Sequence, residues 1–305
     1  MIQTDQTIMK EIILHHVSNE EGKSVTGKTL FEFEPEDEES VLKKIFLKPF
    51  TSLHHTFEFT HDVNLEFNVL FNLAREIHTG SDFIQTTGKI SDHLTSVSKH
   101  PNIKDGEVFM VKFQDIGWND RHYQALGIYK FEDKDSFIET SVSKNKINYS
   151  FRKGIGGKKP DKACLIIFTE EPYTLLIIDN NSQETDYWQN EFINQKPKND
   201  FVNNTSDFLT ITKNFITKQI PEDFEVTKAD QIDYLNRSVE YFKTHDNFNK
   251  EEFETEVFHH ENIINSFRRF DQTYRRENDI DLEDNFEISE LAVKKQARIF
   301  KSVLK

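Results

Sequence analysis

The sequence has 305 residues, a net charge of -15, 30% charged residues and 36% hydrophobic residues, with 28 phenylalanines among them. A chain of this length can bury a sizeable core, and it suggests one large domain or two modest ones. Because each phenylalanine can bury a large apolar area, the composition is that of a folded protein and excludes an intrinsically disordered one. The negative charge argues against a general attraction to nucleic acid, so any DNA binding requires a local basic surface.

The N-terminal segment and the single cysteine indicate the compartment. Residues 1–16, MIQTDQTIMKEIILHH, contain acids and lack the basic start and the uninterrupted apolar run of a signal peptide. No window of the sequence has the length and apolarity needed to span a bilayer. We therefore expect a cytoplasmic protein with no membrane partner. Cys164 lies in the apolar run ACLIIF and has no second cysteine to pair with, so a buried, unreactive thiol is expected.

The residues before position 100 predict one strand followed by three helices. The strand is EIILHHV at 11–17. Apolar residues recur at helical spacing in three later segments. The helices predicted from them are 40–47, 62–78 and 81–98. Since these helices precede the main strands, they can cover one face of a sheet, an arrangement typical of α+β proteins.

The residues that follow predict two hairpins with an extended segment between them. Segments 106–116 and 122–131 alternate in polarity and flank the turn-forming IGWND. A third extended segment is predicted at 136–151, and residues 164–179 predict a hairpin that turns at 170–172. The very apolar strands CLIIF and YTLLII are expected at the centre of a mainly antiparallel sheet.

A polar break at 194–206 separates this region from a helical one. Apolar residues at helical spacing predict four further helices, at about 208–216, 232–242, 253–267 and 288–303. The fold class is therefore predicted to be α+β, with two domains. Residues 1–195 are expected to form an α+β domain with an antiparallel sheet, and residues 205–305 a smaller helical domain.

Short motifs in the first two thirds of the chain carry a family resemblance. They are HHVSN at 15–19, FLKPF at 46–50, SDHLTSVSKHPNIKDGE at 91–107, ALGIYKFE at 125–132 and DKACLIIF at 161–168. In this order and at this spacing, the chain resembles the 37-kDa nucleoid-associated protein family of bacteria, most closely over residues 11–220. The resemblance implies a cytoplasmic protein of the nucleoid that binds double-stranded DNA without strong sequence preference.

The resemblance transfers no DNA-contact residue. The positions that match best are His15, His16 and Asn19 in HHVSN, and Pro101, Lys104 and Gly106 in KHPNIKDGE. No helix-turn-helix or zinc-finger pattern is visible. The chain stops at Lys305 directly after a predicted helix, where relatives are expected to continue. This suggests a shorter member or a truncated chain, whose missing element could carry part of a binding surface.

The first candidate for nucleic-acid binding rests on charge alone. The segment SFRKGIGGKKPDK at 150–162 combines five basic residues with three glycines and one acid. Glycines allow backbone N–H groups to approach an anion, and the cations can neutralise phosphates. The basic residues are Arg152, Lys153, Lys158, Lys159 and Lys162. The alternative is an ordinary loop between strands with solvated lysines, and no nucleotide-binding fingerprint is matched.

Two further basic groups lie near the C-terminus. Lys294, Arg298 and Lys301 share one face of the last predicted helix, although an ordinary amphipathic surface helix would show the same pattern. The arginines at 268, 269, 275 and 276 are interpreted as salt-bridge partners of the acidic stretch at 279–290.

The sequence gives no sign of a metal site or of catalysis. The pairs His15/His16, His54/His55 and His259/His260 match no zinc-binding spacing, and neighbours on a strand point to opposite faces. A G-x-S-x-G turn is absent. We therefore expect no metal, no cofactor and no catalytic residue.

Two functions of different classes fit these observations. The first is a non-catalytic nucleoid protein that contacts DNA through a local basic surface, as a homodimer that pairs its positive patches. The second is an acidic protein-interaction module that a basic protein partner recruits to the nucleoid, with little direct DNA binding. A nuclease or other hydrolase acting on nucleic acid has no positive support in the sequence.

Overall fold

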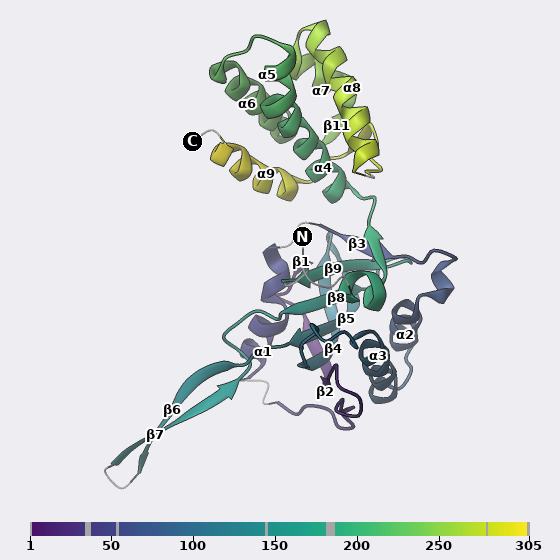
Figure 1. Ribbon diagram of the computed structural model, residues 1–305, viewed down its shortest axis with the longest axis vertical. Helices are drawn as coiled ribbons and strands as arrows, with labels where there is room; N and C mark the ends of the chain where they lie inside the picture. Colours follow the sequence, from purple (N-terminus) through teal and green to yellow (C-terminus); the bar gives the residue numbers. More distant parts are fainter. Residues whose placement is uncertain are drawn as a thin grey trace. The chain divides into compact units, whose positions relative to one another are not determined.

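The structure is a computed structural model that describes residues 2–33, 38–52, 55–143, 146–180, 187–278 and 280–303. Its contacts divide the chain into two compact units. Unit 1 comprises Met1–Leu53 and Phe57–Lys196, and unit 2 comprises His54–Thr56 and Pro197–Lys305. The predicted α+β class is confirmed, because a large antiparallel sheet with helices lies in the N-terminal part and helices dominate the C-terminal part (Figure 1).

Unit 1 is built on one sheet. The strands of this sheet within the described residues are β1 (Ile2–Gln3), β2 (Ile8–Val17), β3 (Phe57–Phe59), β4 (Gly106–Trp118), β5 (Arg121–Phe131), β8 (Lys162–Ile167), β9 (Thr174–Asp179) and β10 (Gln195–Pro197). Their order is β1-β4-β5-β8-β9-β3-β10, and β2 also pairs with β4. The hairpins predicted for β4–β5 and β8–β9 are confirmed, and β8 lies inside the sheet as its apolar sequence predicted.

The helices of unit 1 cover both faces of the sheet, so the prediction that they cover one face was wrong. They are α1 (Glu39–Phe46), α2 (Val69–His78) and α3 (Phe83–Val97). Helices α2 and α3 pack on the face that bears Met110 and Ile128, while α1 packs on the face that bears Phe113 and Tyr129. Because alternate strand residues point to opposite faces, a sheet covered on both sides has strands that are apolar at almost every position.

Helix α2 begins later than predicted because of its N-terminal cap. The side-chain Oδ1 of Asn68 accepts a hydrogen bond from the N–H of Phe71 at 2.9 Å. Its Nδ2 donates to the carbonyl oxygens of Thr60, Ile193 and Asn194, each at 2.9 Å. A buried asparagine with this set of partners fixes the helix start, since it satisfies donors that the first turn leaves free.

The turn between β4 and β5 has the geometry that its sequence predicted. Asn119 and Asp120 adopt positive φ angles of 47° and 59°, which asparagine and aspartate tolerate better than most residues. At the other end of β4, a Cβ atom on Gly106 would lie 2.8 Å from the carbonyl oxygen of Phe131. Only glycine therefore permits β4 to approach β5 this closely at that position.

The extended segment predicted at 136–151 is a separate hairpin. It consists of β6 (Asp135–Ser143) and β7 (Lys146–Gly154), which pair with each other along their whole length. Among the described strands, these two form a sheet of their own. The hairpin extends away from the rest of unit 1, and we refer to β6 and β7 as the arm (Figure 1).

Unit 2 is mainly helical. Its elements are α4 (Phe201–Asn214), α5 (Ile220–Asp223), α6 (Lys228–Thr244), α7 (Lys250–Phe258), α8 (Glu261–Glu277) and α9 (Glu290–Val303), with a small hairpin of β11 (Asn247–Asn249) and β12 (Asn285–Glu287). Helix α4 begins inside the predicted break, because Oδ1 of Asp200 caps the N–H groups of Val202 and Asn203, both at 3.0 Å. The helix predicted at 253–267 is two helices, α7 and α8, separated at His259, where φ is 57°.

Phenylalanines fill the core of unit 2. The ring of Phe208 lies 4.3 Å from that of Phe248 and 5.0 Å from that of Phe253, measured between centroids. Phe215 and Phe267 are 5.1 Å apart in an edge-to-face arrangement. None of the helices in the described ranges is both long enough and apolar enough to cross a membrane.

Candidate nucleic-acid interface

The arm is held at its base by polar contacts with the sheet of unit 1. The N–H of Glu132 donates to Oδ2 of Asp161 at 2.8 Å, and the N–H of Asp161 donates to the carbonyl oxygen of Lys130 at 3.1 Å. Lys134 Nζ lies 2.7 Å from Oε1 of Glu107 on β4. These contacts join the two points where the chain leaves the sheet and returns to it, so the base of the arm is fixed to unit 1.

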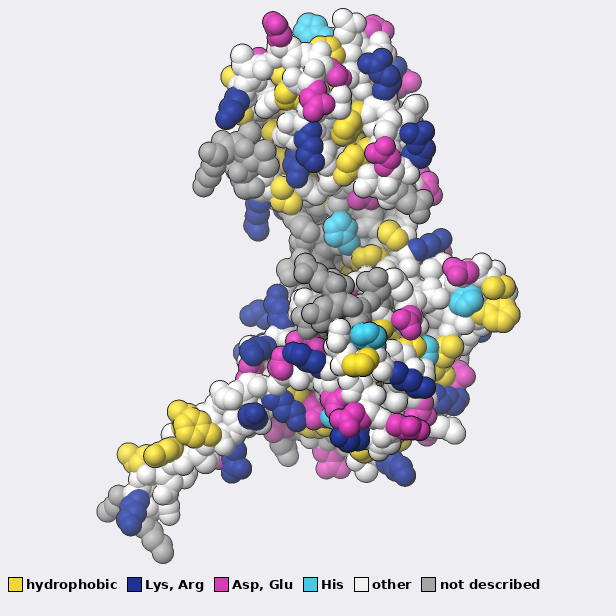
Figure 2. Space-filling view, viewed as in Figure 1, with side chains coloured by type: hydrophobic (Ala, Val, Ile, Leu, Met, Phe, Trp, Pro, Cys, Tyr) yellow, Lys and Arg dark blue, Asp and Glu magenta, His cyan; other side chains and the backbone are white. Residues whose placement is uncertain are grey.

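Four of the five basic residues predicted in segment 150–162 are exposed. They are Arg152 and Lys153 on β7, and Lys158 and Lys159 in the loop that follows. Arg152 Nε lies 3.0 Å from Oε2 of Glu139, and Lys158 Nζ lies 3.4 Å from Oδ1 of Asp135. Residues 135–159 contain six lysines or arginines and two acids. Figure 2 shows basic side chains near the tip of the arm and around its base.

Lys162 does not belong to this surface, which corrects the sequence-based prediction. Its side chain is 2% exposed, and its Nζ lies 2.6 Å from Oδ1 of Asp179, which is equally buried. Lys130, also buried, donates to the hydroxyl of Tyr187 at 3.1 Å and to the carbonyl oxygen of Lys104 at 2.6 Å. Lys162 is therefore part of the interior of unit 1 and is not available to a phosphate. Lys162 pairs with Asp179 because the two residues lie opposite each other in the β8–β9 register. The residues around Lys162 in the sequence do not reveal this register.

The sequence analysis did not identify the apolar side chains of the arm as a surface. Six of them are more than half exposed: Phe137, Ile138, Val142, Ile147, Tyr149 and Phe151. Their alternation with polar residues is visible in the sequence, but it also fits a strand in a covered sheet. The residues between the apolar ones distinguish the two cases. In the arm they are mostly polar, whereas in a strand buried on both faces they would be apolar as well.

The basic stripe predicted on the last helix lies on α9 of unit 2. Lys294 and Arg298 are exposed, and Lys294 Nζ lies 3.0 Å from Oε2 of Glu290 one turn earlier. The side chain of Lys301 lies outside the part of the structure that is described. Helix α9 packs through Val293 and Phe300, which are buried. The described part of the stripe is thus solvent-facing, with one of its cations already beside an acid.

Among the residues that the structure describes, two of the four arginines of α8 form ion pairs, and only Arg275 pairs with the acidic stretch at 279–290 as predicted. Arg268 lies 2.6 Å from the buried carboxylate of Glu254, and Arg275 lies 2.7 Å from that of Asp271. Arg275 also approaches Oδ1 of Asp284 at 3.3 Å, a partner within the predicted acidic stretch. Because Glu254 and Asp271 are buried, these arginines serve to neutralise interior charge in unit 2.

The motifs that carry the family resemblance meet in space. Asn19 of HHVSN donates from Nδ2 to the carbonyl oxygen of Ile103 at 2.8 Å, and from its backbone N–H to Oδ1 of Asp105 at 3.0 Å. His15 is buried, and its Nδ1 accepts from the N–H of Gly27 at 3.1 Å. Burial lowers the pKa of His15 to about 4. The matching positions therefore connect β2 with the segment before β4, which is a structural role.

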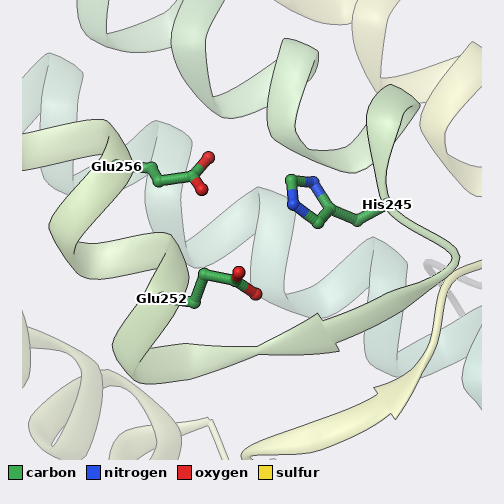
Figure 3. Close-up of side chains that lie close together, drawn as sticks. All are labelled: His245, Glu252 and Glu256. Carbon is green, nitrogen blue, oxygen red and sulfur yellow. The ribbon is translucent and has the colours of Figure 1, made fainter.

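Within the described residues, one group of histidine and acidic side chains has the spacing of a metal site (Figure 3). His245, at the end of α6, and Glu252 and Glu256, on α7, point toward one another with their ligand atoms within 4.8 Å. The donor set would suit a divalent ion such as Zn²⁺.

His245 and Glu252 have protein partners. Nδ1 of His245 is 2.9 Å from the carbonyl oxygen of Tyr241, and the hydroxyl of Tyr241 donates to Oε2 of Glu252 at 3.1 Å. Burial raises the pKa of Tyr241 to about 12, so this hydroxyl keeps its proton. The packing of α6 on α7 therefore accounts for the positions of His245 and Glu252 without an ion.

Cys164 has the environment that its sequence predicted. It is a free, fully buried cysteine on β8, among the apolar residues of the sheet. Burial raises the pKa of its thiol, which keeps the group protonated and unreactive.

A family of known proteins matches nearly the whole chain. No curated protein matches this chain. The family model described as nucleoid-associated protein YejK matches residues 13–303, which include most of the sheet of unit 1, the arm and the helices of unit 2. The chain therefore belongs to the family of the nucleoid-associated protein YejK.

Proposed function

We propose that this protein is a non-catalytic, cytoplasmic nucleoid protein that binds double-stranded DNA directly and without strong sequence preference. The proposed contact surface consists of Arg152, Lys153, Lys158 and Lys159, on the arm and in the loop after it. Membership of a nucleoid-associated family supports the association with the nucleoid. The observation that carries the proposal is the concentration of six basic residues against two acids within 135–159, in a chain whose net charge is -15.

The chemistry of this surface suits the phosphate backbone. Lysine ammonium groups act as mobile point charges, and three of the four proposed contacts are lysines. Contacts with phosphates position a protein on DNA but carry no sequence information. Because the remainder of the chain is more acidic than the whole, it is repelled by phosphates, and the basic segment is the part that can approach. The result is weak specificity with strong salt dependence.

The stripe on α9 is a second proposed contact. Lys294, Arg298 and Lys301 belong to unit 2, so they can be tested separately from the arm. Lys294 already lies beside Glu290. Arg152 and Lys158 also lie beside acids. Because the arm and its loop bring four proposed cations and the stripe brings three, we expect the α9 stripe to contribute less to DNA affinity.

The test is fluorescence anisotropy with a random-sequence duplex of about 30 base pairs over a series of salt concentrations, where non-specific binding has a Kd of roughly 10⁻⁴ to 10⁻⁶ M at physiological salt. The variant Lys158→Glu/Lys159→Glu reverses two charges in the loop. Its affinity should fall at least about tenfold for all sequences alike, and the slope of log K against log salt should shrink by about 2. Lys294→Glu/Arg298→Glu tests α9 in the same way.

Lys23→Glu/Lys89→Glu is the matched control. Both lysines belong to unit 1, both are exposed, and the change in net charge is identical. If the control loses as much affinity as the loop variant, only overall charge matters and the proposed surface is wrong. If the wild-type protein does not bind the duplex even at low salt, the alternative of an acidic module recruited by a protein partner takes the place of DNA binding.

A further inference from the structure

The arm has one apolar face and one polar face. The strand register pairs Ile138 with Phe151, Thr140 with Tyr149 and Val142 with Ile147. Residues directly opposite in an antiparallel pair lie on the same side, and alternate residues along each strand share a face. The other side carries Phe137 near the base and otherwise polar residues, namely Glu139, Ser141, Ser143, Lys146, Asn148, Ser150 and Arg152.

The apolar face is open to solvent in the single chain. The exposed fractions are 57% for Ile138, 78% for Val142, 78% for Ile147, 73% for Tyr149 and 74% for Phe151. A lone two-stranded hairpin is marginally stable in water, and it needs a partner for its apolar side. Contiguous apolar patches of this kind on soluble proteins mark interaction sites. Figure 2 shows hydrophobic side chains gathered along the arm.

DNA does not suit this face. The grooves of duplex DNA present hydrogen-bonding base edges, with the thymine methyl as the apolar group of the major groove. Proteins that insert apolar side chains between bases use them as single wedges. A row of five apolar side chains requires an apolar surface of similar length, which another protein surface offers.

The charge distribution on the apolar face favours a second copy of this chain as the protein partner. In a symmetric dimer the same patch meets itself, so a patch of charged residues would repel its own copy. The apolar face has no acid, and its one cation is Lys153 at the base, opposite Ser136. The acids and the remaining cations of the strands lie on the other face. The face can therefore meet its own copy without bringing like charges together at its centre.

The area is sufficient for association. Fully buried aromatic side chains contribute about 150–250 Å² each, so Tyr149 and Phe151 at their exposed fractions offer on the order of 300 Å² together. With the three aliphatic residues, the face offers on the order of 600 Å² per copy, or about 1,200 Å² for two copies, the lower end of stable protein interfaces.

We infer that the apolar face of the arm is a dimer interface, packed against the same face of a second copy. The basic residues of the polar face and of the loop at 155–161 then remain exposed on both copies. The inference does not depend on DNA binding, and it is tested without nucleic acid.

The test is sedimentation equilibrium of the full chain, whose monomer mass is 36.0 kDa. The wild-type protein should sediment with twice this mass. Tyr149→Glu places a charge at the centre of the apolar face and should weaken the dimer at least about tenfold. Asn148→Glu is the matched control, because it adds the same charge to the adjacent residue on the polar face, and it should remain dimeric. Circular dichroism checks that both variants keep the fold of unit 1.

A charge-swap experiment tests whether the same faces meet. Tyr149→Lys should also be monomeric alone, but an equal mixture with Tyr149→Glu should form heterodimers. In the inferred dimer, residue 149 belongs to the middle cross-strand pair and lies near the two-fold axis, so the opposite charges of the two variants meet. A monomeric wild-type protein, or an unaffected Tyr149→Glu dimer, would show that the arm is not the interface. Failure of the mixture to associate, although each variant is monomeric, would show that the arm docks elsewhere on its partner.

Discussion

Two pairs of antiparallel strands in unit 1, β8–β9 and the arm, both contain apolar residues, but these are buried in the first pair and exposed in the second. In β8–β9 all residues are buried apart from Asp179, whose side chain is nevertheless only 2% exposed, and the apolar side chains fill the cores on both faces of the sheet. In the arm, residues 135–154, nearly all described side chains are exposed. The difference shows that apolar strand residues stabilise the unit only where helices cover them. In the arm the same residue types remain available to a partner.

The contrast extends to charge. Lys158 is mostly exposed in the loop, whereas Lys162, four residues later, is buried in an ion pair with Asp179. Both lie in the segment 150–162, which the sequence analysis treated as one basic group. Lysines of one short segment therefore belong to two different parts of the molecule, one structural and one proposed to bind DNA.

The largest expected effect is on the buried ion pair. Lys162→Met leaves the Asp179 carboxylate buried without its cation, which should lower the free energy of unfolding by about 3–5 kcal/mol. Lys158→Met, in the exposed loop, should change it by no more than about 0.5 kcal/mol. Urea unfolding monitored by tryptophan fluorescence measures both. Equal effects of the two substitutions would contradict the distinction between the buried and the exposed lysine.

The next largest effect is the loss of unfolding free energy when an apolar residue is truncated in β8–β9 or in the arm. Ile166→Ala on β8 removes a fully buried side chain and should cost about 2–5 kcal/mol of unfolding free energy. Ile147→Ala on the arm should cost no more than about 0.5 kcal/mol in a single chain. The comparison is made by urea unfolding in the Tyr149→Glu background, so that dimer formation does not contribute. A loss above 2 kcal/mol at Ile147 would mean that the arm is covered within its own chain.

A smaller effect depends on pH. In the folded protein burial lowers the pKa of His15 from 6.5 to about 4, so the unfolded chain binds more protons between these two values. The stability that neutral His15 contributes is complete above pH 6.5 and is lost as the pH falls toward 4, by up to about 3 kcal/mol. His15→Asn, whose side-chain oxygen can accept from Gly27, should remove this dependence. Urea unfolding at pH 7 and pH 4.5 measures it.

Asp207 of unit 2 also makes stability depend on pH, so the effect of His15 must be measured as the difference between the wild type and His15→Asn. Burial, with Asp200 nearby, raises its pKa from 3.8 to about 6. The protonated form is therefore favoured in the folded state, and this contribution to stability grows as the pH falls, opposite in sign to that of His15. The difference between wild type and His15→Asn isolates the histidine. A difference that does not change with pH would contradict its lowered pKa.

The smallest expected effect concerns divalent ions. Because protein contacts hold His245 and Glu252 in place, removal of metal with EDTA should leave the thermal unfolding midpoint unchanged, as should addition of Zn²⁺ at a low stoichiometric ratio. His245→Gln provides the comparison. A zinc-dependent rise in the midpoint that is lost in His245→Gln would establish a metal site and overturn this expectation.

The sequence predicted much of the secondary structure, but not how its elements are used. The β4–β5 turn followed from Asn119 and Asp120, because these residues tolerate positive φ. The start of α2 did not follow from its pattern, since the cap at Asn68 depends on carbonyl groups more than 120 residues away. The exposed candidates Arg152, Lys153, Lys158 and Lys159 were found by charge, whereas the burial of Lys162 required its partner on another strand.

By itself the sequence determined the α+β class, the main hairpins, the inert cysteine and the family, since all of these depend on local spacing and on motifs. Only the tertiary structure decided that helices cover both faces of the sheet, that residues 135–154 form an arm, and which lysines face solvent. The physical reason is that alternation of apolar residues fixes which side of a strand is apolar. It does not fix what covers that side, because the covering element lies elsewhere in the chain or in another molecule.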